Sequence, residues 1–183
     1  MKDTYKKTVV ATLKKELKQE NEMAIPKLTK VTLNVGIGSY VRSGDKNFDP
    51  VIENITMLSG QKPIVKNARL AISNFKLREG NPVGVAVTLR GDRLYDFVNR
   101  LVNVVLPRIR DFRGISVKGF DGKGNYTLGI KEITVFPEVN PDSISRNHGM
   151  QITIGTSATN NREGYLLLKN LGFPFKDEIK DNN

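Results

Sequence analysis

Hydrophobic and polar residues alternate in several short stretches of the chain, which is the pattern of a strand with one buried face and one open face. In the first of them, Val31, Leu33 and Val35 alternate with Thr32 and Asn34. In another stretch, residues 83–89, valine and leucine alternate with glycine, alanine and threonine, so a partner can approach the open face of this strand closely. The patterns predict strands at residues 27–36, 61–66, 83–89, 126–136 and 151–156, the fourth as one broken strand or two short ones.

Helical spacing separates these strands. Leu94, Phe97 and Leu101 recur every three to four residues as far as Pro107, where we expect the helix to end. Asp92 is a candidate N-cap for this helix, because an aspartate carboxylate accepts hydrogen bonds from the free N–H groups of a first turn. The same reasoning predicts helices at residues 3–20, 49–58, 92–106 and 160–171, with Asp49 and either Asn160 or Asn161 as further caps.

The order of these elements indicates the fold class. Helices and strands alternate without an internal repeat, and several strands are half-buried. This order favours an α+β fold, in which a largely antiparallel sheet has helices packed on one face and an open side on the other. The 183 residues are enough to bury a core. We expect a single domain over residues 1–175 and a flexible C-terminal tail over residues 176–183.

Positive charge is concentrated in the middle of the chain. Residues 61–125 hold 13 lysines and arginines against 5 acidic residues, and so carry +8 of the net charge of +10. This charge predicts a polyanionic partner, either nucleic acid or an anionic membrane surface. Membrane binding favours a basic helix with large aromatic side chains on its other face, and the first predicted helix has only Tyr5. Nucleic acid is therefore the favoured partner, and we expect no membrane partner.

Cysteine usage and hydropathy suggest the compartment. The chain has no cysteine, which fits a reducing environment and excludes disulfides and thiolate metal sites. Its first residues, MKDTYKKTVVATLKKELKQ, lack an apolar run long enough for a signal peptide, and no later segment has the length of a bilayer span. We expect a soluble cytoplasmic protein.

Residues with catalytic potential are few. The single histidine, His148, lies in a predicted loop, where we expect it to be solvated. Four acidic residues are candidate Mg²⁺ ligands for a nuclease, but each has a lysine or arginine nearby that balances its charge. They are Asp111, Asp121, Glu132 and Glu138. The sequence predicts no enzyme, no metal site and no cofactor.

Residue types suited to RNA are more numerous. Asn34, Gln61 and Thr88 lie near the open faces of predicted strands, where they can meet ribose 2′-hydroxyls or base edges in a wide, shallow minor groove. Phe75 can stack on an exposed base or can pin its own loop to the core. The sequence has no helix-turn-helix or zinc-finger motif, so RNA is favoured over DNA. The candidate phosphate contacts are Lys62, Lys66, Arg69, Lys76, Arg78 and Arg90.

Two other functions stay open on the residues alone. A general RNA chaperone would bind by charge and would tolerate the loss of Asn34 and Thr88. A Mg²⁺-dependent nuclease would cleave RNA when supplied with the metal.

Longer motifs make the chain resemble a known family. They are LNVGIG at 33–38, SGQKP at 59–63, FKLREGNPVGVAVTLRG at 75–91, LPRIRDFRGISVKGFDGKGNYTLGI at 106–130 and FPF at 173–175. These runs are similar, in order and over nearly the whole chain, to ribosomal protein five of the large subunit in its bacterial form, the universal 5S rRNA-binding family. The resemblance implies a structural, non-enzymatic protein bound to the ribosome.

The resemblance also implies partners and the residues that bind them. The implied partners are 5S rRNA in the central protuberance, large-subunit rRNA, other 5S-rRNA-binding ribosomal proteins, the elbow of the P-site tRNA and a protein of the small-subunit head. The expected 5S rRNA residues are Asn34, Gln61 and Thr88, with Thr32, Lys62 and Arg90 around them.

Two loops complete the implied interface. The first spans residues 66–82 and faces tRNA, and the second spans residues 108–125 and contacts the small subunit. We expect the second loop to be mobile in the free protein, because it has four glycines and few apolar anchors. The tRNA-facing residues are Lys66, Asn67, Arg69, Phe75, Lys76 and Arg78. The inter-subunit residues are Arg108, Arg110, Asp111, Arg113 and Lys118.

Overall fold

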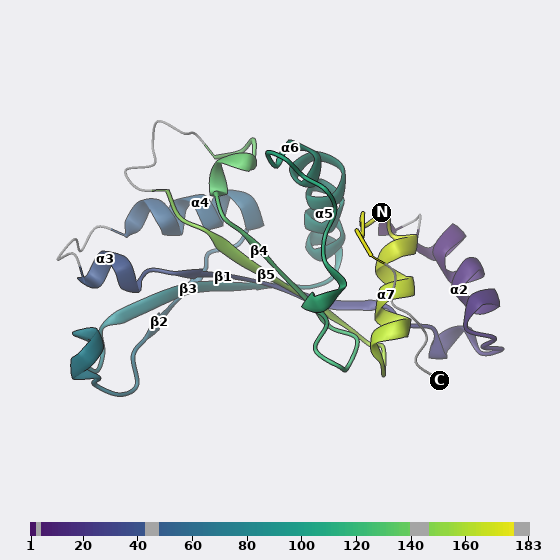
Figure 1. The fold of residues 1–183 in the computed structure, drawn as a ribbon, viewed down its shortest axis with the longest axis horizontal. Helices are drawn as coiled ribbons and strands as arrows, with labels where there is room; N and C mark the ends of the chain where they lie inside the picture. The colour runs from purple at the N-terminus through teal and green to yellow at the C-terminus, as the bar shows by residue number, and fades with distance from the viewer. Residues whose placement is uncertain (3–4, 43–47, 140–146, 178–183) are drawn as a thin grey trace. The chain divides into compact units, whose positions relative to one another are not determined.

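Five strands form one sheet in the part of the chain that the computed structural model describes, which is residues 1–2, 5–42, 48–139 and 147–177 (Figure 1). The strands lie in the order β2-β3-β1-β5-β4 and are antiparallel, so the fold is α+β as predicted. Their bounds are β1 Leu28–Gly36, β2 Ile64–Asn67, β3 Pro82–Leu89, β4 Tyr126–Ile130 and β5 Met150–Thr156.

The helices differ from their predicted bounds mainly at their ends. The first was expected to reach residue 20 but stops at Glu16, because Lys18 adopts a left-handed conformation with φ of 51°. The α-helical and π-helical segments are η1 Tyr5–Val9, α2 Val10–Glu16, α3 Gly38–Arg42, α4 Asp49–Ser59, α5 Asp92–Arg100, η4 Leu101–Val105, α6 Leu106–Arg108 and α7 Asn161–Asn170. The short 3₁₀ turns are η2 Glu22–Ala24, η3 Ser73–Phe75, η5 Val117–Gly119 and η6 Ile133–Val135.

Two of the predicted N-caps are wrong. Helix α5 begins with Asp92 itself, after Gly91 at the cap position. The Asp92 carboxylate instead accepts a hydrogen bond from Lys2 Nζ, which holds the pKa of this carboxyl below its usual range. Helix α4 likewise begins at Asp49 with no side-chain cap. The cap of α7 is confirmed, because Asn160 accepts a hydrogen bond from the Glu163 N–H at 2.9 Å.

The chain divides into two units. Unit 1 comprises residues 1–31, 89–128 and 153–183, and unit 2 comprises residues 32–88 and 129–152. Strands β1, β3, β4 and β5 each contribute residues to both.

In unit 1, the continuous helical run from α5 through η4 to α6 buries its apolar stripe. Leu94, Phe97, Leu101 and Val105 are all 1% exposed or less. Helix α2 packs on α7. The backbone of α7 at Gly164 also approaches the backbone of Gly124 closely, because a Cβ on Gly164 would lie 2.4 Å from the Gly124 carbonyl oxygen.

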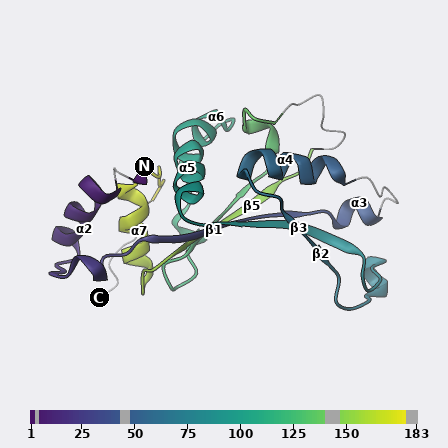
Figure 2. The same ribbon diagram turned by 180° about the vertical axis from the view of Figure 1, so that it is seen from behind.

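In unit 2, helix α4 lies over one side of the strands, and no other helix of the unit covers their opposite side in the described residues (Figures 1 and 2). Ile55 and Leu58 of α4 are fully buried, as are Leu33 of β1 and Val85 of β3. These side chains form the core of the unit. The alternation seen in the sequence therefore separates a buried face from an open one, as predicted.

The segment predicted as one broken strand or two short ones is a strand followed by a turn. Strand β4 ends at Ile130, and the 3₁₀ turn Ile133–Val135 follows. The Ile133 N–H donates to the carbonyl of His148 at 3.2 Å. His148 is only 9% exposed, so the expectation of a solvated histidine was wrong.

We expect Gly164→Ala to lower the thermal unfolding midpoint. Alanine in a helix normally improves stability by about 1 kcal/mol, but here the new methyl meets the Gly124 backbone, and overpacking of this kind costs about 2 kcal/mol. Gly129→Ala is the matched control, because its Cβ would meet no atom within 4 Å. An equal or higher midpoint for Gly164→Ala would contradict the close approach.

Candidate RNA-binding interface

The open face of unit 2 is lined by small and polar residues. Thr32 and Asn34 of β1 alternate with buried neighbours, as do Ala86 and Thr88 of β3, and Gly84 lies on the same side, where a Cβ would stand 3.7 Å from Asn34 Oδ1. The Thr32 and Thr88 hydroxyl oxygens lie 3.5 Å apart. Since Asn34 is two residues from Thr32 on the same strand, Asn34 and Thr88 point to the same side of the sheet. The sequence-predicted residues Thr32, Asn34 and Thr88 therefore share one surface.

Strand β2 extends this surface at the edge of the sheet. Its register pairs Ile64 with Ala86 and Lys66 with Gly84, so both β2 side chains stand on the open face. Val65 pairs with Val85 and faces the core side. Lys66, predicted as a tRNA-loop residue, is therefore a strand residue of the open face.

Gln61 and Lys62 lie in the short connection between α4 and β2, and both are exposed. The Gln61 backbone N–H donates to Ser59 Oγ at 3.1 Å, and Gly60 caps α4 in the left-handed conformation. These contacts hold the Gln61 backbone in place while its side chain remains accessible. Arg90 is exposed as well, but it belongs to unit 1.

The loop between β2 and β3 is a structured hairpin end. Ile72 and Leu77 exchange two backbone hydrogen bonds of 2.9 and 3.1 Å, and Ala68 is bonded to both Gly80 and Asn81. Asn67 ends β2, and the loop's basic side chains are exposed. These basic residues are Arg69, Lys76 and Arg78.

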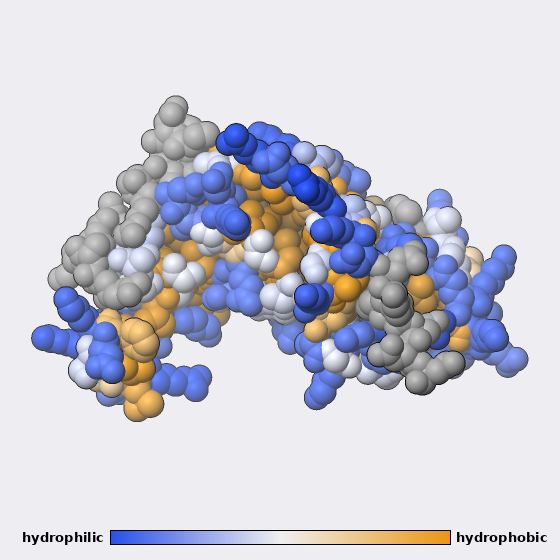
Figure 3. Space-filling view, viewed as in Figure 1, coloured by the Kyte–Doolittle hydropathy of each residue, from blue (hydrophilic) through white to orange (hydrophobic). Residues whose placement is uncertain are grey.

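Hydrophobic side chains are also exposed on this hairpin end. Leu70 is 74% exposed, Ile72 43% and Phe75 62%. Figure 3 shows hydrophobic surface at this end of the hairpin, with hydrophilic side chains around it. The alternative that Phe75 pins its loop to the core is therefore wrong.

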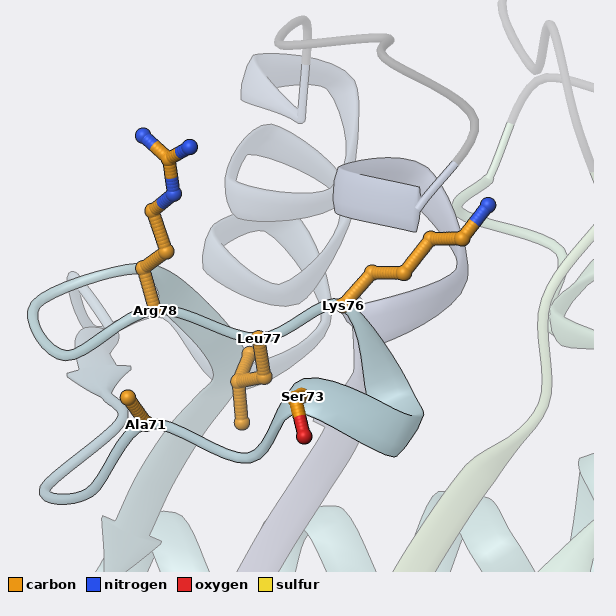
Figure 4. A pocket seen from close by; sticks show the side chains of 5 residues that line it. All are labelled: Ala71, Ser73, Lys76, Leu77 and Arg78. Carbon is orange, nitrogen blue, oxygen red and sulfur yellow. The ribbon is translucent and has the colours of Figure 1, made fainter.

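A shallow cavity of about 530 Å³ lies beside Leu77 in the same loop (Figure 4). The Lys76 and Arg78 side chains extend away from the loop in different directions. The residues that line this cavity are Ala71, Ser73, Lys76, Leu77 and Arg78. The hairpin end thus combines apolar surface with three exposed cations.

The second predicted loop, residues 108–125 of unit 1, has more anchors than the sequence suggested. Ile115 is buried, and its N–H and C=O bond the backbones of Pro174 and Lys176 at 2.8 and 2.9 Å. The Phe120 ring lies 4.8 Å from Tyr126 and 5.9 Å from Phe175 between centroids. The premise of few apolar anchors was therefore wrong. The predicted contact residues Arg108, Arg110, Asp111, Arg113 and Lys118 are exposed.

Polar bonds fix the tip of this loop. The Asp121 carboxylate accepts hydrogen bonds from the Lys123 and Asn125 N–H groups and from the Asn125 side chain. These bonds, the Asn125 side chain first, lower the pKa of Asp121. Asn161 Oδ1 accepts from the Gly122 and Gly124 N–H groups. Asp121 thus supports the loop, and the described residues include no group of side chains that could hold a metal ion.

The basic residues of unit 2 are available to a ligand. Five of them, in the connection before β2, in β2 and in the hairpin end, form no ion pair with another described residue, and the ion pairs of Lys2 with Asp92 and of Lys14 with Glu22 both lie in unit 1. They are Lys62, Lys66, Arg69, Lys76 and Arg78. Among described residues, no helix combines the length and hydropathy that crossing a bilayer requires.

Comparison with known proteins identifies the family. A family model described as Ribosomal protein L5 matches residues 21–78, and a second model, described as the C-terminus of the same ribosomal family, matches residues 82–175. The chain belongs to the ribosomal protein L5 family. Members of the L5 family are structural, non-enzymatic components of the large ribosomal subunit that bind ribosomal RNA, in agreement with the sequence-based expectations.

Several relatives match this L5-family chain almost end to end. A protein of Desulfatibacillum aliphaticivorans, named large ribosomal subunit protein uL5, is 51% identical over 96% of this chain and 98% of its own length. Proteins of the same name from Anaeromyxobacter sp. (strain Fw109-5) and Corynebacterium kroppenstedtii are 49% and 52% identical. Each covers 96% of this chain, over 97% and 95% of its own length.

We expect alkaline pH to destabilise unit 1 through Tyr126. Burial raises the pKa of Tyr126 to about 12, whereas an unfolded tyrosine titrates near about 10. The stability from the protonated phenol is therefore complete below about pH 10 and is lost as the pH rises toward about 12. Tyr126→Phe also removes the 2.8 Å hydrogen bond to the Ser116 carbonyl, at a cost of about 1 kcal/mol at neutral pH.

Urea unfolding at several pH values checks this expectation. The free energy of unfolding should fall less steeply with pH in Tyr126→Phe than in the unchanged chain. Part of the alkaline loss should persist in the variant, because burial also raises the pKa of Tyr5 to about 12. If the free energies of unfolding of the two proteins fell in parallel with rising pH, Tyr126 would make no contribution to the alkaline loss of stability.

Proposed function

We propose that this protein binds 5S rRNA through the open face of unit 2 and anchors it in the central protuberance of the large subunit. The observation that carries the proposal is the shared surface of Thr32, Asn34 and Thr88, with Thr32 and Thr88 in contact at 3.5 Å. Gln61 and Lys62 lie in the connection before the adjacent edge strand. Arg90 of unit 1 belongs to the same proposed set.

The chemistry of this face suits folded RNA. Hydroxyl and carboxamide groups both donate and accept hydrogen bonds, as ribose 2′-hydroxyls do. Gly84 and Ala86 add little height between the polar residues, so a shallow minor groove can lie against the strands. The unpaired lysines and arginines of unit 2 supply attraction to phosphates.

We further propose that the hairpin end at residues 66–82 contacts the elbow of the P-site tRNA. Phe75 is exposed enough to stack on a base or ribose. Lys66, Asn67, Arg69, Lys76 and Arg78 would contact the tRNA backbone. The loop at residues 108–125 would bridge to a protein of the small-subunit head through its exposed charges.

Replacing Asn34 or Thr88 by alanine should weaken binding to folded 5S rRNA about tenfold, because each variant removes a side-chain hydrogen bond to the RNA that forms only in the correctly docked complex. Lys15→Ala, on the exposed side of α2, should weaken it less than about threefold. Filter binding or fluorescence anisotropy at one fixed salt concentration measures this. Equal losses for all three variants would indicate binding by charge alone.

A salt titration separates the charge contribution. The logarithm of the affinity should fall linearly with the logarithm of salt concentration. Lys62→Ala should make the slope shallower by about one unit, whereas Thr88→Ala should lower the affinity without changing the slope. A slope change in Thr88→Ala would contradict its role as an uncharged contact.

Phe75→Ala should weaken crosslinking of reconstituted large subunits to P-site tRNA without lowering affinity for 5S rRNA. Loss of one stacked aromatic costs about 1–3 kcal/mol of binding. Phe75→Tyr keeps the ring and serves as the matched control. An unchanged crosslink in Phe75→Ala would exclude Phe75 from the tRNA contact.

A further inference from the structure

Strand β5 brings a further polar residue to the open face of unit 2. Gln151 lies between the buried residues Met150 and Ile152, and it is exposed. The Asn34 side-chain amide donates to Gln151 Oε1 at 3.5 Å, although the two residues are 117 positions apart. Asn34 of the proposed RNA surface therefore has a carboxamide partner that the sequence did not suggest.

The remaining hydrogen-bonding groups of this amide pair point to a ligand. Among the described residues, neither the Asn34 nor the Gln151 side chain forms another hydrogen bond. The pair retains the two N–H groups of Gln151, the second side-chain N–H of Asn34 and the carbonyl oxygen of Asn34. Donors and an acceptor side by side match a ribose 2′-hydroxyl next to a base edge in the minor groove.

The neighbouring strand leaves space for that ligand. Thr127 of β4 and Thr153 of β5 face each other, with hydroxyl oxygens 3.2 Å apart. Counting two residues along each antiparallel strand from this pair places Gly129 beside Gln151. A Cβ on Gly129 would meet nothing within 4 Å, so packing does not require glycine there. Glycine inside a strand often marks the close approach of another backbone.

We propose that Gln151 is a further RNA-recognition residue of this protein, which donates hydrogen bonds from the open face while Asn34 holds its carboxamide. The inference rests on the proposed binding of 5S rRNA to this face. Gln151 differs from the basic residues because its carboxamide forms directional hydrogen bonds but carries no charge. It should affect the choice of RNA more than the salt dependence of binding.

The experiment measures the affinity of the purified full chain for folded 5S rRNA and for a generic RNA duplex of equal length. Gln151→Ala should bind 5S rRNA about fivefold more weakly, and Gln151→Glu more weakly still, because its carboxylate cannot donate and repels phosphate. Gly129→Val should also weaken binding while leaving the thermal midpoint unchanged. None of these variants should weaken duplex binding as much as 5S rRNA binding.

A second exposed amide pair provides the matched control. Asn103 donates to Asn99 at 2.7 Å on the helical run of unit 1. Asn103→Ala should leave 5S rRNA affinity within about twofold of the unchanged chain, since one lost surface contact outside the interface does not alter the complex. A double variant of Asn34 and Gln151 should lose less than the product of the two single losses, because the residues act as a pair.

The outcomes separate this inference from the function on which it rests. If the unchanged chain prefers 5S rRNA but both Gln151 variants bind it within about twofold of the unchanged chain, Gln151 has no recognition role and the proposed function stands. If the unchanged chain shows no preference for 5S rRNA over the duplex, the proposed function fails and the inference with it. Selective loss in both Gln151 variants, with Asn103→Ala unaffected, supports the assignment.

Discussion

Burial of only one face of the unit 2 strands is the constraint on which the interface depends. Helix α4 and the inward side chains of β1 and β3 form the core, so alternate residues must point away from it. A one-residue change of register would exchange Leu33 for Asn34 and bury an unpaired amide. The packing that stabilises the unit therefore also fixes which polar groups are presented together.

The charged groups and the neutral hydrogen-bonding groups of this surface act on a ligand in different ways. The exposed cations of β2 and the hairpin end attract any polyanion, whereas the neutral hydroxyl and carboxamide groups add hydrogen bonds that depend on the geometry of the ligand. Leu70 and Phe75 on the same hairpin are mostly exposed and so bury little apolar area in the free chain. In unit 1, by contrast, the aromatic cluster of Phe120, Tyr126 and Phe175 holds a glycine-rich loop in a defined conformation.

Several features were not predictable because they depend on contacts between distant residues. Asp92 has the side chain of a good cap, but Lys2, 90 positions away, engages its carboxylate. His148 was expected to be solvated, yet its carbonyl accepts a hydrogen bond from the Ile133 N–H and the residue is buried. The loop at residues 108–125 gained its anchors from residues 174–176, which lie far along the chain. Local patterns carry no information on such pairs.

The sequence by itself determined the five strands and longer helices, the antiparallel α+β class, and Thr32, Asn34 and Thr88 as open-face residues, because alternation and helical spacing are local consequences of backbone geometry. Its longer motifs also indicated the family. Only the tertiary structure decided that Asn34 meets Gln151 and that Phe75 is exposed. Strand order and side-chain contact depend on how the whole chain packs, and neither is encoded in the spacing of a single segment.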